Sequence, residues 1–260
     1  MDDSKFEENL VRLGVIHKKV NIFPFVEKIF DTNVTSSQID TASELIYDNR
    51  TDIVINGSVT FSRLAKNRNI SPGAFLTDNS DFPILKKNYG EDNLLNGDAI
   101  YGKVKDMEIP SDDKFYFMRP VKDDKSFSGM EIHSFQFHNW KAGLLTLTED
   151  EALLNANTEI VIASVKLIYK EWRFFVCNGK IVTYSLYKMN DKVHAAIDIN
   201  VGAENFVNQM IDLWTPHIAY VIDVALTPYG YKIVELNAFG SAGFYKCDTQ
   251  KIIIAVEELG

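Results

Sequence analysis

Cysteine is scarce in this sequence. The 260 residues contain two, Cys177 and Cys247, which stand far apart and show neither CxxC nor Cys/His spacing. A zinc site is therefore disfavoured, and a reducing compartment is expected. The five histidines do not supply the missing signal, because they show no HExxH or other metal-binding spacing.

Long apolar runs and a basic charge balance are also missing. No apolar run reaches the ~18 residues that a membrane-spanning helix needs. Residues 1–5 lack the basic and apolar regions of a signal peptide. The formal net charge of −9 argues against nonspecific binding to nucleic acid, although it is compatible with a local basic cleft. We therefore expect a cytoplasmic protein that has neither a membrane nor a nucleic acid as its partner.

Three catalytic signatures fail or are absent. The segment from Gly97 to Lys103 matches the first seven positions of a Walker A loop, but Val104 stands where that loop needs a hydroxyl for Mg²⁺. Pro110 also leaves little room for the helix that should follow. The chain has no Lys-x-Asp-Gly, which disfavours a nucleic-acid ligase of the lysyl-adenylate type, and it has no GxSxG nucleophile elbow.

Apolar periodicity predicts helices and strands in mixed order, in one large domain or in two lobes divided near residue 105. The expected helices cover residues 6–13, 23–29, 37–47, 133–141, 203–213 and, after an Asp248 cap, 248–259. The expected strands cover residues 52–56, 114–118, 159–163, the hairpin 170–188 with an Asn178-Gly179 turn, 219–226 and 231–237. Residues 70–98 look loop-like, because they are rich in Pro, Asn, Asp and Gly.

The run from Tyr231 to Asn237 is the most informative stretch of the chain. It reads as an apolar strand with Glu235 and Asn237 on one face, since residues two apart on a strand point the same way. A carboxylate and an amide oxygen form a pair of hard ligands suited to Mg²⁺. A buried apolar strand rarely ends in such a pair without a functional reason.

A third oxygen ligand comes from the preceding strand. If Pro228, Tyr229 and Gly230 form a hairpin loop, Thr227 faces Tyr231 and Asp223 falls opposite Glu235. Like charges that face each other across a strand pair are unfavourable, and a cation between them is a plausible remedy. The alternative is that Asp223 and Glu235 are ordinary solvated strand residues.

The hairpin at residues 170–188 carries charges that suit a phosphate. With Asn178 and Gly179 as the turn, counting places Arg173 opposite Tyr184 and Glu171 opposite Leu186. Four side chains then share one face: Glu171, Arg173, Tyr184 and Lys188. Arg would clamp phosphate oxygens with its fork of donors, and Lys would act as a point charge. The alternative is an exposed charged face.

A second anion-binding candidate follows the strand that ends in Arg119-Pro120. The loop from Val121 to Gly129 is polar and closes on glycine, so it offers backbone N–H groups and hydroxyls to an anion. Arg119 and Lys125 would add positive charge. A lysine-rich surface loop is the alternative.

Taken in order, these motifs resemble the ATP-grasp superfamily, and most of all a small branch found in phages and bacteria. The matching residues span about half the chain, from 115 to 243. They are Phe117-Met-Arg119-Pro120, Lys125-Ser-Phe-Ser-Gly129, Glu171-Trp-Arg173-Phe-Phe-Val-Cys-Asn-Gly179, Asp223 and Glu235-Leu-Asn237.

The resemblance implies an α+β chain with the ATP-grasp fold, in which two α+β subdomains grip ATP. It implies a smaller N-terminal α/β lobe at residues 1–105 and an ATP-grasp domain at residues 106–260. One departure is that Arg119 stands where many members have Lys. The other customary nucleotide-binding lysine has no clear counterpart, and Lys103 and Lys105 are the candidates.

The resemblance also implies roles for the matching positions, with ATP and Mg²⁺ as cofactors. The residues implied to contact the nucleotide are Arg119, the phosphate loop with Lys125, Ser126, Ser128 and Gly129, the adenine hinge with Ala163, Ser164 and Val165, and Glu171 and Arg173 beside the ribose and phosphates. The residues implied to hold one or two Mg²⁺ ions are Asp223, Glu235 and Asn237.

The implied activity is that of a carboxylate–amine or carboxylate–thiol ligase. ATP would phosphorylate a carboxylate, and an amine or thiol on a small molecule or peptide would displace phosphate from the acylphosphate. Arg173 and Lys188 are the predicted catalytic residues, because they would offset charge on the phosphoryl group. The alternatives are an ATP-binding regulatory or phage–host interaction protein, active in the host cytoplasm if phage-encoded, and a Mg²⁺-dependent hydrolase built on Asp223 and Glu235 alone.

Overall fold

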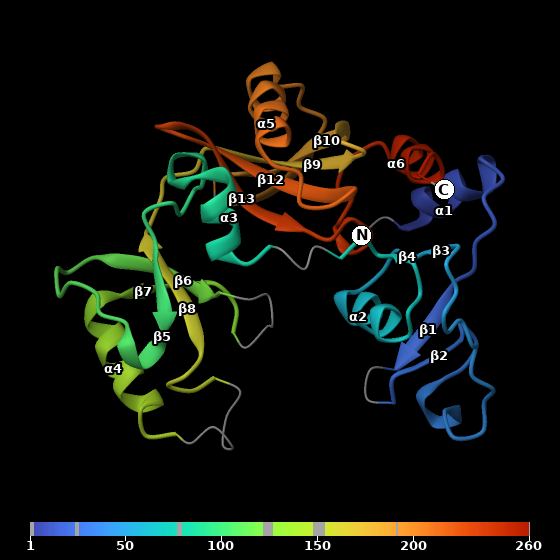
Figure 1. The fold of residues 1–260 in the computed structure, drawn as a ribbon, viewed down its shortest axis with the longest axis horizontal. Helices are drawn as coiled ribbons and strands as arrows, with labels where there is room; N and C mark the ends of the chain where they lie inside the picture. The colour runs from blue at the N-terminus through green and yellow to red at the C-terminus, as the bar shows by residue number, and fades with distance from the viewer. Residues whose placement is uncertain are drawn as a thin grey trace.

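The structure, a computed structural model, consists of a central sheet with a smaller body on either side of it (Figure 1). It describes residues 3–23, 26–76, 80–121, 127–147, 154–190 and 192–259. Within those ranges no helix combines the length and apolar character needed to cross a membrane. Helices and strands are mixed along the chain, as expected for the α+β class.

The centre of the molecule is a five-stranded antiparallel sheet in the order β11-β10-β9-β12-β13. Asn178 and Gly179 join β9 to β10, and both have positive φ (49° and 70°), as a tight two-residue hairpin turn requires. The strands of this sheet are β9 (Lys170–Cys177), β10 (Lys180–Met189), β11 (Lys192–Ala196), β12 (Ala219–Thr227) and β13 (Gly230–Asn237).

Alternation along β9 gives the central sheet two different faces. Trp172, Phe174 and Val176 point into the largest core cluster, which α3 and α5 cover. Phe175 and Cys177 point to the opposite face, where α6 packs with α1 against it. The covering helices are α1 (Asp3–Arg12), α3 (Phe82–Tyr89), α5 (Val201–Leu213) and α6 (Thr249–Glu257).

A second, four-stranded antiparallel sheet in the order β5-β8-β6-β7 lies at the left of Figure 1. Its buried side chains, among them Met118, Ile160 and Ile162, pack with Phe137 of α4. Residues 165–169 lead from β8 directly into β9, so this body is joined to the central sheet by a short connection. Its elements are β5 (Ile100–Lys103), β6 (Phe115–Pro120), β7 (Met130–His133), α4 (Ser134–Leu144) and β8 (Glu159–Ser164).

The third body, at the lower right of Figure 1, comes from the N-terminal part of the chain. Two short parallel strands, β3 and β4, are connected by α2, whose N-cap Ser58 accepts a hydrogen bond from the Phe61 amide. An antiparallel pair, β1 and β2, adds Ile29 to the small core. The elements are β1 (Val20–Phe23), β2 (Lys28–Asp31), β3 (Ile53–Val54), α2 (Val59–Asn67) and β4 (Pro72–Gly73).

Four short 3₁₀ turns complete the described part of the chain. They are η1 (Ser36–Gln38), η2 (Glu91–Asn93), η3 (Val104–Asp106) and η4 (Phe239–Ser241). η4 links two bodies: the Gly57 amide donates to the Gly240 carbonyl (2.8 Å), and the Gly240 amide donates to the Ala74 carbonyl (3.0 Å). A Cβ at Gly240 would lie 2.1 Å from the Ile55 carbonyl oxygen, so only glycine permits this contact.

The helices expected at residues 6–13, 133–141 and 203–213 are confirmed as α1, α4 and α5, and Asp248 caps α6 through the amides of Gln250 and Lys251. Two expected helices are wrong. Residues 23–29 include the ends of the pair β1 and β2, because short apolar runs fit a strand as well as a helix. Only the turn η1 enters residues 37–47, where the Leu45 amide instead bonds to the carbonyl of Ile29 in β2 (2.8 Å).

The loop expected at residues 70–98 is also wrong in part, because it contains α3. Asp81 stands at the N-cap position of this helix and Pro83 lies in its first turn, where proline lacks no needed hydrogen bond. The Asp and Pro that suggested a loop are therefore the start signal of a helix, and Phe82, Leu85 and Tyr89 bury its inner face.

Candidate functional site

Polar side chains gather on the face of the central sheet that α6 covers elsewhere. On β9, positions 171 and 173 precede Phe175 by four and two residues, so the three side chains share this face. Neighbouring strands contribute the remainder. We call the group the polar patch, and its members are Glu171, Arg173, Lys188, Asp223, Glu235 and Asn237.

The centre of the polar patch is a two-pronged ion pair between neighbouring strands. Arg173 on β9 and Asp223 on β12 are register partners. The guanidinium donates from Nε to Oδ1 (2.9 Å) and from Nη2 to Oδ2 (2.7 Å), and Nη1 reaches the Gly243 carbonyl (3.4 Å). The Asp223 side chain is fully buried and that of Arg173 is 10% exposed. Most of the arginine fork is therefore committed to Asp223, which limits what it can offer to a phosphate.

The buried charge of Asp223 is only partly compensated. Burial raises the pKa of this carboxyl to about 7; Arg173 opposes the rise, and Glu235 and Glu171 add to it. Two cations face three carboxylates in the polar patch. A further positive charge near Asp223 would therefore stabilise its ionised form.

Asn237 bridges the two carboxylates of the predicted metal site. Its Nδ2 donates to Asp223 Oδ2 (3.2 Å) and to Glu235 Oε1 (3.1 Å). Glu235 is exposed, whereas Asn237 is half-buried. The structure thus brings Asp223, Glu235 and Asn237 together at one edge of the polar patch, with an amide donor where two carboxylates converge.

The predicted pairing of Asp223 with Glu235 is confirmed, but the predicted route to it is wrong. The turn has two residues, so Thr227 pairs with Gly230 instead of Tyr231. A β-bulge at Val234 then shifts the register by one residue and brings Glu235 opposite Asp223. The shorter turn and the bulge compensate each other.

The predicted register of the 170–188 hairpin is wrong beyond Ile181. The structure has bulges on β10 between Ile181 and Thr183 and between Leu186 and Lys188. Tyr184 consequently pairs with Phe174 and stacks on its ring at 4.4 Å, on the α5 face and away from the polar patch. A count from the turn cannot reveal bulges, which add one residue to one strand only.

The second bulge brings Lys188 opposite Glu171. The carboxylate of Glu171 is buried; its Oε2 accepts from the Tyr187 hydroxyl (2.6 Å), and its Oε1 lies 2.9 Å from Lys188 Nζ. Burial, followed by the charges of Asp223 and Glu171, raises the pKa of Tyr187 well above its usual value. The Tyr187 hydroxyl therefore keeps its proton and acts as a donor.

Two tyrosines in this region were not predicted as site residues. Tyr187 stacks on Tyr245 at 5.1 Å, and the Arg173 guanidinium carbon lies 5.4 Å and 5.2 Å from the two ring centres. Tyr245 has a positive φ of 49° and is 40% exposed. The aromatic residues before and after the charged motifs were the signal available, but the bulge that aims Tyr187 at Arg173 has no sequence signature.

The four-stranded sheet carries the predicted phosphate-binding residues. Arg119 is half-buried at the end of β6, with its guanidinium carbon 6.0 Å from the centre of the Phe82 ring. Gly129 faces it across the loop: a Cβ there would lie 3.6 Å from the Cβ of Arg119 and 2.9 Å from the Phe117 ring. Ser128 is exposed beside it. Lys125 and Ser126 lie outside the described residues.

The predicted adenine hinge lies where β8 leaves its sheet. Ala163 is buried, and Ser164 and Val165 are exposed. The Ser164 hydroxyl donates to Asp98 Oδ2 (2.6 Å), which Lys166 Nζ also approaches to 2.6 Å. Sequence reasoning missed Asp98 and Lys166, whose association joins the start of β5 to the connection between the two sheets.

The donor set of the polar patch fits Mg²⁺, which prefers carboxylate and amide oxygens and keeps some positions for water or phosphate. Among the residues that the structure describes, no group of three His, Cys, Asp or Glu side chains could hold a metal by itself. A magnesium site here therefore needs the Asn237 oxygen beside Asp223 and Glu235. Cys177 and Cys247 are separate buried thiols, in line with the absence of a zinc signal.

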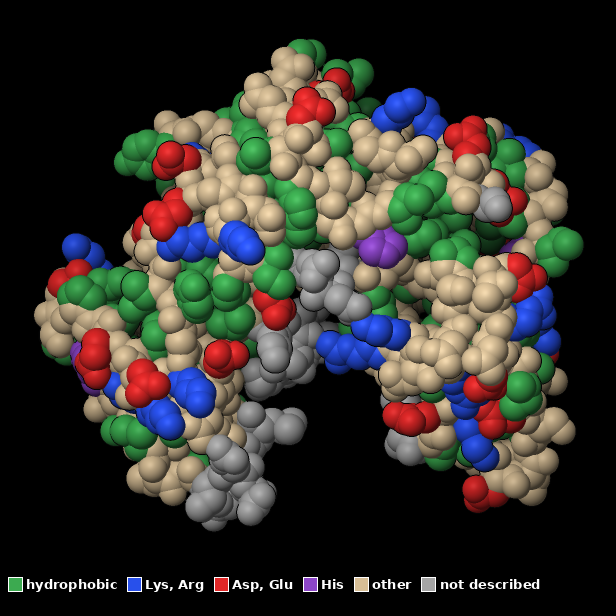
Figure 2. Space-filling view, viewed as in Figure 1, with side chains coloured by type: hydrophobic (Ala, Val, Ile, Leu, Met, Phe, Trp, Pro, Cys, Tyr) green, Lys and Arg blue, Asp and Glu red, His purple; other side chains and the backbone are tan. Residues whose placement is uncertain are grey.

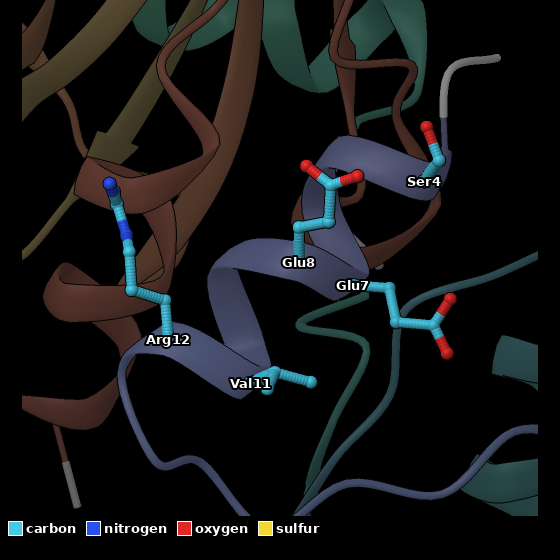
Figure 3. A pocket seen from close by; sticks show the side chains of 5 residues that line it. All are labelled: Ser4, Glu7, Glu8, Val11 and Arg12. Atoms are coloured by element: carbon cyan, nitrogen blue, oxygen red, sulfur yellow. The ribbon is translucent and has the colours of Figure 1, made fainter.

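A pocket of about 440 Å³ on α1 is unrelated to the polar patch (Figure 3). Its charged side chains point in different directions in Figure 3, and two of them already have partners: Glu7 pairs with Lys19, and Arg12 donates to Gln250. It contains none of the predicted site residues. The residues that line it are Ser4, Glu7, Glu8, Val11 and Arg12.

Comparison with known proteins gives a family and a fold. Residues 100–255 match a family model described as an ATP-grasp domain, the second family of its clade. No curated protein sequence matches the chain. The crystal structure of D-cycloserine synthetase DcsG superposes with a TM-score of 0.57 at 6% identity, over 82% of this chain and 86% of that chain.

Two further structures are similar at lower TM-scores. D-alanine–D-alanine ligase from Bacillus anthracis gives 0.48 at 12% identity, over 78% of this chain and 71% of that chain. The ATP-grasp ligase PsnB complexed with minimal precursor gives 0.47 at 10% identity, over 76% of this chain and 66% of that chain. At these identities the likeness to solved structures concerns the fold alone.

Proposed function

Because the chain belongs to this ATP-grasp domain family, we propose that it is an ATP- and Mg²⁺-dependent ligase that joins a carboxylate to an amine or thiol. The family match supports an ATP-dependent ligase at the general level. The observation that carries the finer proposal is the polar patch. It combines oxygen ligands for a metal with cations for phosphate on one otherwise apolar sheet.

ATP would lie between the four-stranded sheet and the polar patch. The connection at residues 163–165 joins the two sheets and would contact the adenine. Arg119, Ser128 and Gly129 would face the phosphates from one side, together with Lys125 and Ser126. Support comes from the position of Gly129 beside Arg119, at the end of a loop that returns to the same sheet edge.

Asp223, Glu235 and Asn237 would hold the metal. When bound, Mg²⁺ would bridge phosphate oxygens and neutralise part of their charge. Asp223 is fixed for this purpose by the Arg173 fork, and its raised pKa shows that the carboxyl lacks positive charge around it. Glu235 is exposed and can reach a ligand without further opening.

Arg173 and Lys188 would oppose the charge that develops on the transferred phosphoryl group. Lys188 has a 32% exposed side chain and three ammonium donors, so it can contact phosphate while paired with Glu171. Arg173 would act mainly by its charge beneath the site, since Asp223 occupies most of its fork. A carboxylate activated as an acylphosphate would then react with the acceptor.

The substrate side would be formed by the N-terminal body. η4 directly follows Asn237 and bonds to residues on both sides of α2, at Gly57 and Ala74. Figure 2 shows a hollow between this body and the four-stranded sheet, with Lys or Arg side chains over α2 at its wall. A carboxylate substrate, small or peptidic, suits such a surface. The cytoplasm stays the expected location.

A nucleotide-binding protein without ligase activity is the second candidate. Two observations favour it: the arginine expected to act on phosphate is paired with Asp223, and Arg119 replaces the lysine of many members. Calorimetry with ATP and Mg²⁺ separates the candidates when combined with ADP release from a pool of carboxylates and amines. Binding with ADP release indicates the ligase, and binding without release indicates the second candidate.

Two variants test the site in the same assays. Glu235→Ala and Asp223→Asn are expected to weaken Mg²⁺-dependent ATP binding at least tenfold and to abolish ADP release. Wild-type ATP affinity and turnover in both variants would refute the proposed metal site.

A further inference from the structure

Glu171 stands where a bulge of β10 presents two successive side chains to the same partner. The bulge leaves Tyr187 unpaired between Leu186, which pairs with Trp172, and Lys188, which pairs with Glu171. In regular strands neighbouring side chains point to opposite faces, and an extra residue removes that alternation. Tyr187 and Lys188 can therefore both contact the Glu171 carboxylate.

Both oxygens of Glu171 are engaged within the sheet. Oε2 accepts from the Tyr187 hydroxyl at 2.6 Å. Oε1 is buried and has no hydrogen bond, so the Lys188 ammonium at 2.9 Å is the charge that compensates it. The Glu171 side chain is 5% exposed, against 32% for Lys188. The carboxylate faces inward, whereas the ammonium lies at the surface of the polar patch.

We propose that Glu171 is a positioning residue, which together with Tyr187 holds the Lys188 ammonium at the polar patch, and that it is not a contact for the ribose of ATP. This inference rests on the proposed ATP site. A ribose contact would need a carboxylate oxygen that points outward, and neither oxygen does. Lys188 keeps ammonium donors for phosphate, and Glu171 fixes where they point.

The first experiment measures the reactivity of Lys188 with an acylating reagent, read peptide by peptide by mass spectrometry, without nucleotide. A lysine in a buried ion pair reacts slowly, because pairing restrains the amine and favours its charged form. Glu171→Gln keeps the side-chain shape, and it is expected to raise the Lys188 rate about fivefold. Lys180, exposed at the start of the same strand, is the internal reference, and its rate is expected to stay constant.

Tyr187→Phe is the matched second variant. It removes one hydrogen bond to Glu171 and leaves the ion pair in place, so the Lys188 rate is expected to rise less than in Glu171→Gln. An unchanged Lys188 rate in Glu171→Gln, with Lys180 also unchanged, would overturn the positioning role. Equal increases at both lysines would overturn it as well, because they would report general loosening of the sheet.

The second experiment asks whether Glu171 contacts the ribose. Calorimetry gives the dissociation constants of ATP and of 2′-deoxy-ATP and 3′-deoxy-ATP for the wild type and Glu171→Gln. The ratio of deoxy to ribo affinity is expected to agree within about twofold between the two proteins, whatever its value. A preference for ATP that is present in the wild type and lost in Glu171→Gln would establish a ribose contact and overturn the inference.

Failure of the proposed function is distinguishable from failure of this inference. If the wild type binds no ATP at millimolar concentration with Mg²⁺, the proposed function fails. The labelling of Lys188 would still decide whether Glu171 holds the ammonium, because that measurement needs no nucleotide.

Discussion

The same two strands, β9 and β12, build two opposite environments on one face of the central sheet. In one half, Phe175 and Val221 are register partners in an apolar cluster that α6 covers. Two residues away along each strand, Arg173 and Asp223 are register partners in a buried ion pair. The strand geometry is continuous across the boundary, so the difference lies entirely in the side chains.

The comparison shows what the polar half costs the fold. Apolar pairs gain free energy from burial directly, whereas a buried ion pair must first overcome the loss of hydration of both charges. Replacing such a pair with apolar residues is often neutral or stabilising. A chain that keeps Arg173 and Asp223 beside an apolar half therefore has a use for the charges beyond stability, which fits the proposed site.

The largest effect is expected from breaking the pair on one side. Asp223→Ala leaves the Arg173 charge buried and unpaired, and we expect the free energy of unfolding to fall by about 3–5 kcal/mol in urea titration. The double variant Asp223→Ala with Arg173→Leu removes both charges and should lose less than the single variant. A double variant less stable than Asp223→Ala would contradict this account of the polar half.

A smaller loss is expected in the apolar half. Val221→Ala removes two buried methyl groups from a fully buried position, which should lower the free energy of unfolding by about 2 kcal/mol while ATP affinity is retained. Val193→Ala, at a 76% exposed position of the same sheet, is the control and should change stability little. Equal losses in the two variants would show that the apolar half is not a packed core.

The cover of the apolar half gives the next effect. Asp248 Oδ1 accepts from the amides of Gln250 (3.0 Å) and Lys251 (3.3 Å) at the start of α6. Asp248→Ala should therefore cost about 1 kcal/mol, and Asp248→Ser should retain most of that. Thermal unfolding followed by circular dichroism measures both. No difference between alanine and serine would mean that the cap does not contribute.

The smallest effect on stability is expected at the exposed edge of the polar half. Glu235→Gln should change the free energy of unfolding by less than about 0.5 kcal/mol in the absence of ligands. With ATP and Mg²⁺ at saturating concentration, a tenfold weaker affinity would remove about 1.4 kcal/mol of ligand stabilisation. Adding a chelator should abolish the difference, and Glu258→Gln, at a distant exposed position, should not show it.

The sequence predicted the fold class and family correctly because their signals are local and ordered. The α+β ATP-grasp fold is supported by the family match and by the likeness to D-cycloserine synthetase DcsG. Asp223 and Glu235 were paired correctly, since a hairpin fixes its own register near the turn. The division at residue 105 and the roles of the site residues stay predictions.

What the sequence did not predict depends on contacts between distant segments. The bulges of β10 that move Tyr184 away and bring Lys188 to Glu171 follow from packing on both faces of the sheet, and no turn residue announces them. The apolar residues around Ile29 form a strand, because a partner strand is available to pair with them. Asp98 joined the hinge through a contact with Ser164, 66 positions away in the sequence.

The interleaving of segments has a consequence for how the chain can be divided. The residues matched by the family, 100–255, exclude α3, yet Tyr89 of that helix packs against Trp214 and donates to its carbonyl (3.2 Å). They also exclude α1, where Phe6 stacks on Phe244 at 4.7 Å. A fragment cut at residue 100 would expose both surfaces. The segment that defines the family is therefore not an autonomous folding unit in this protein.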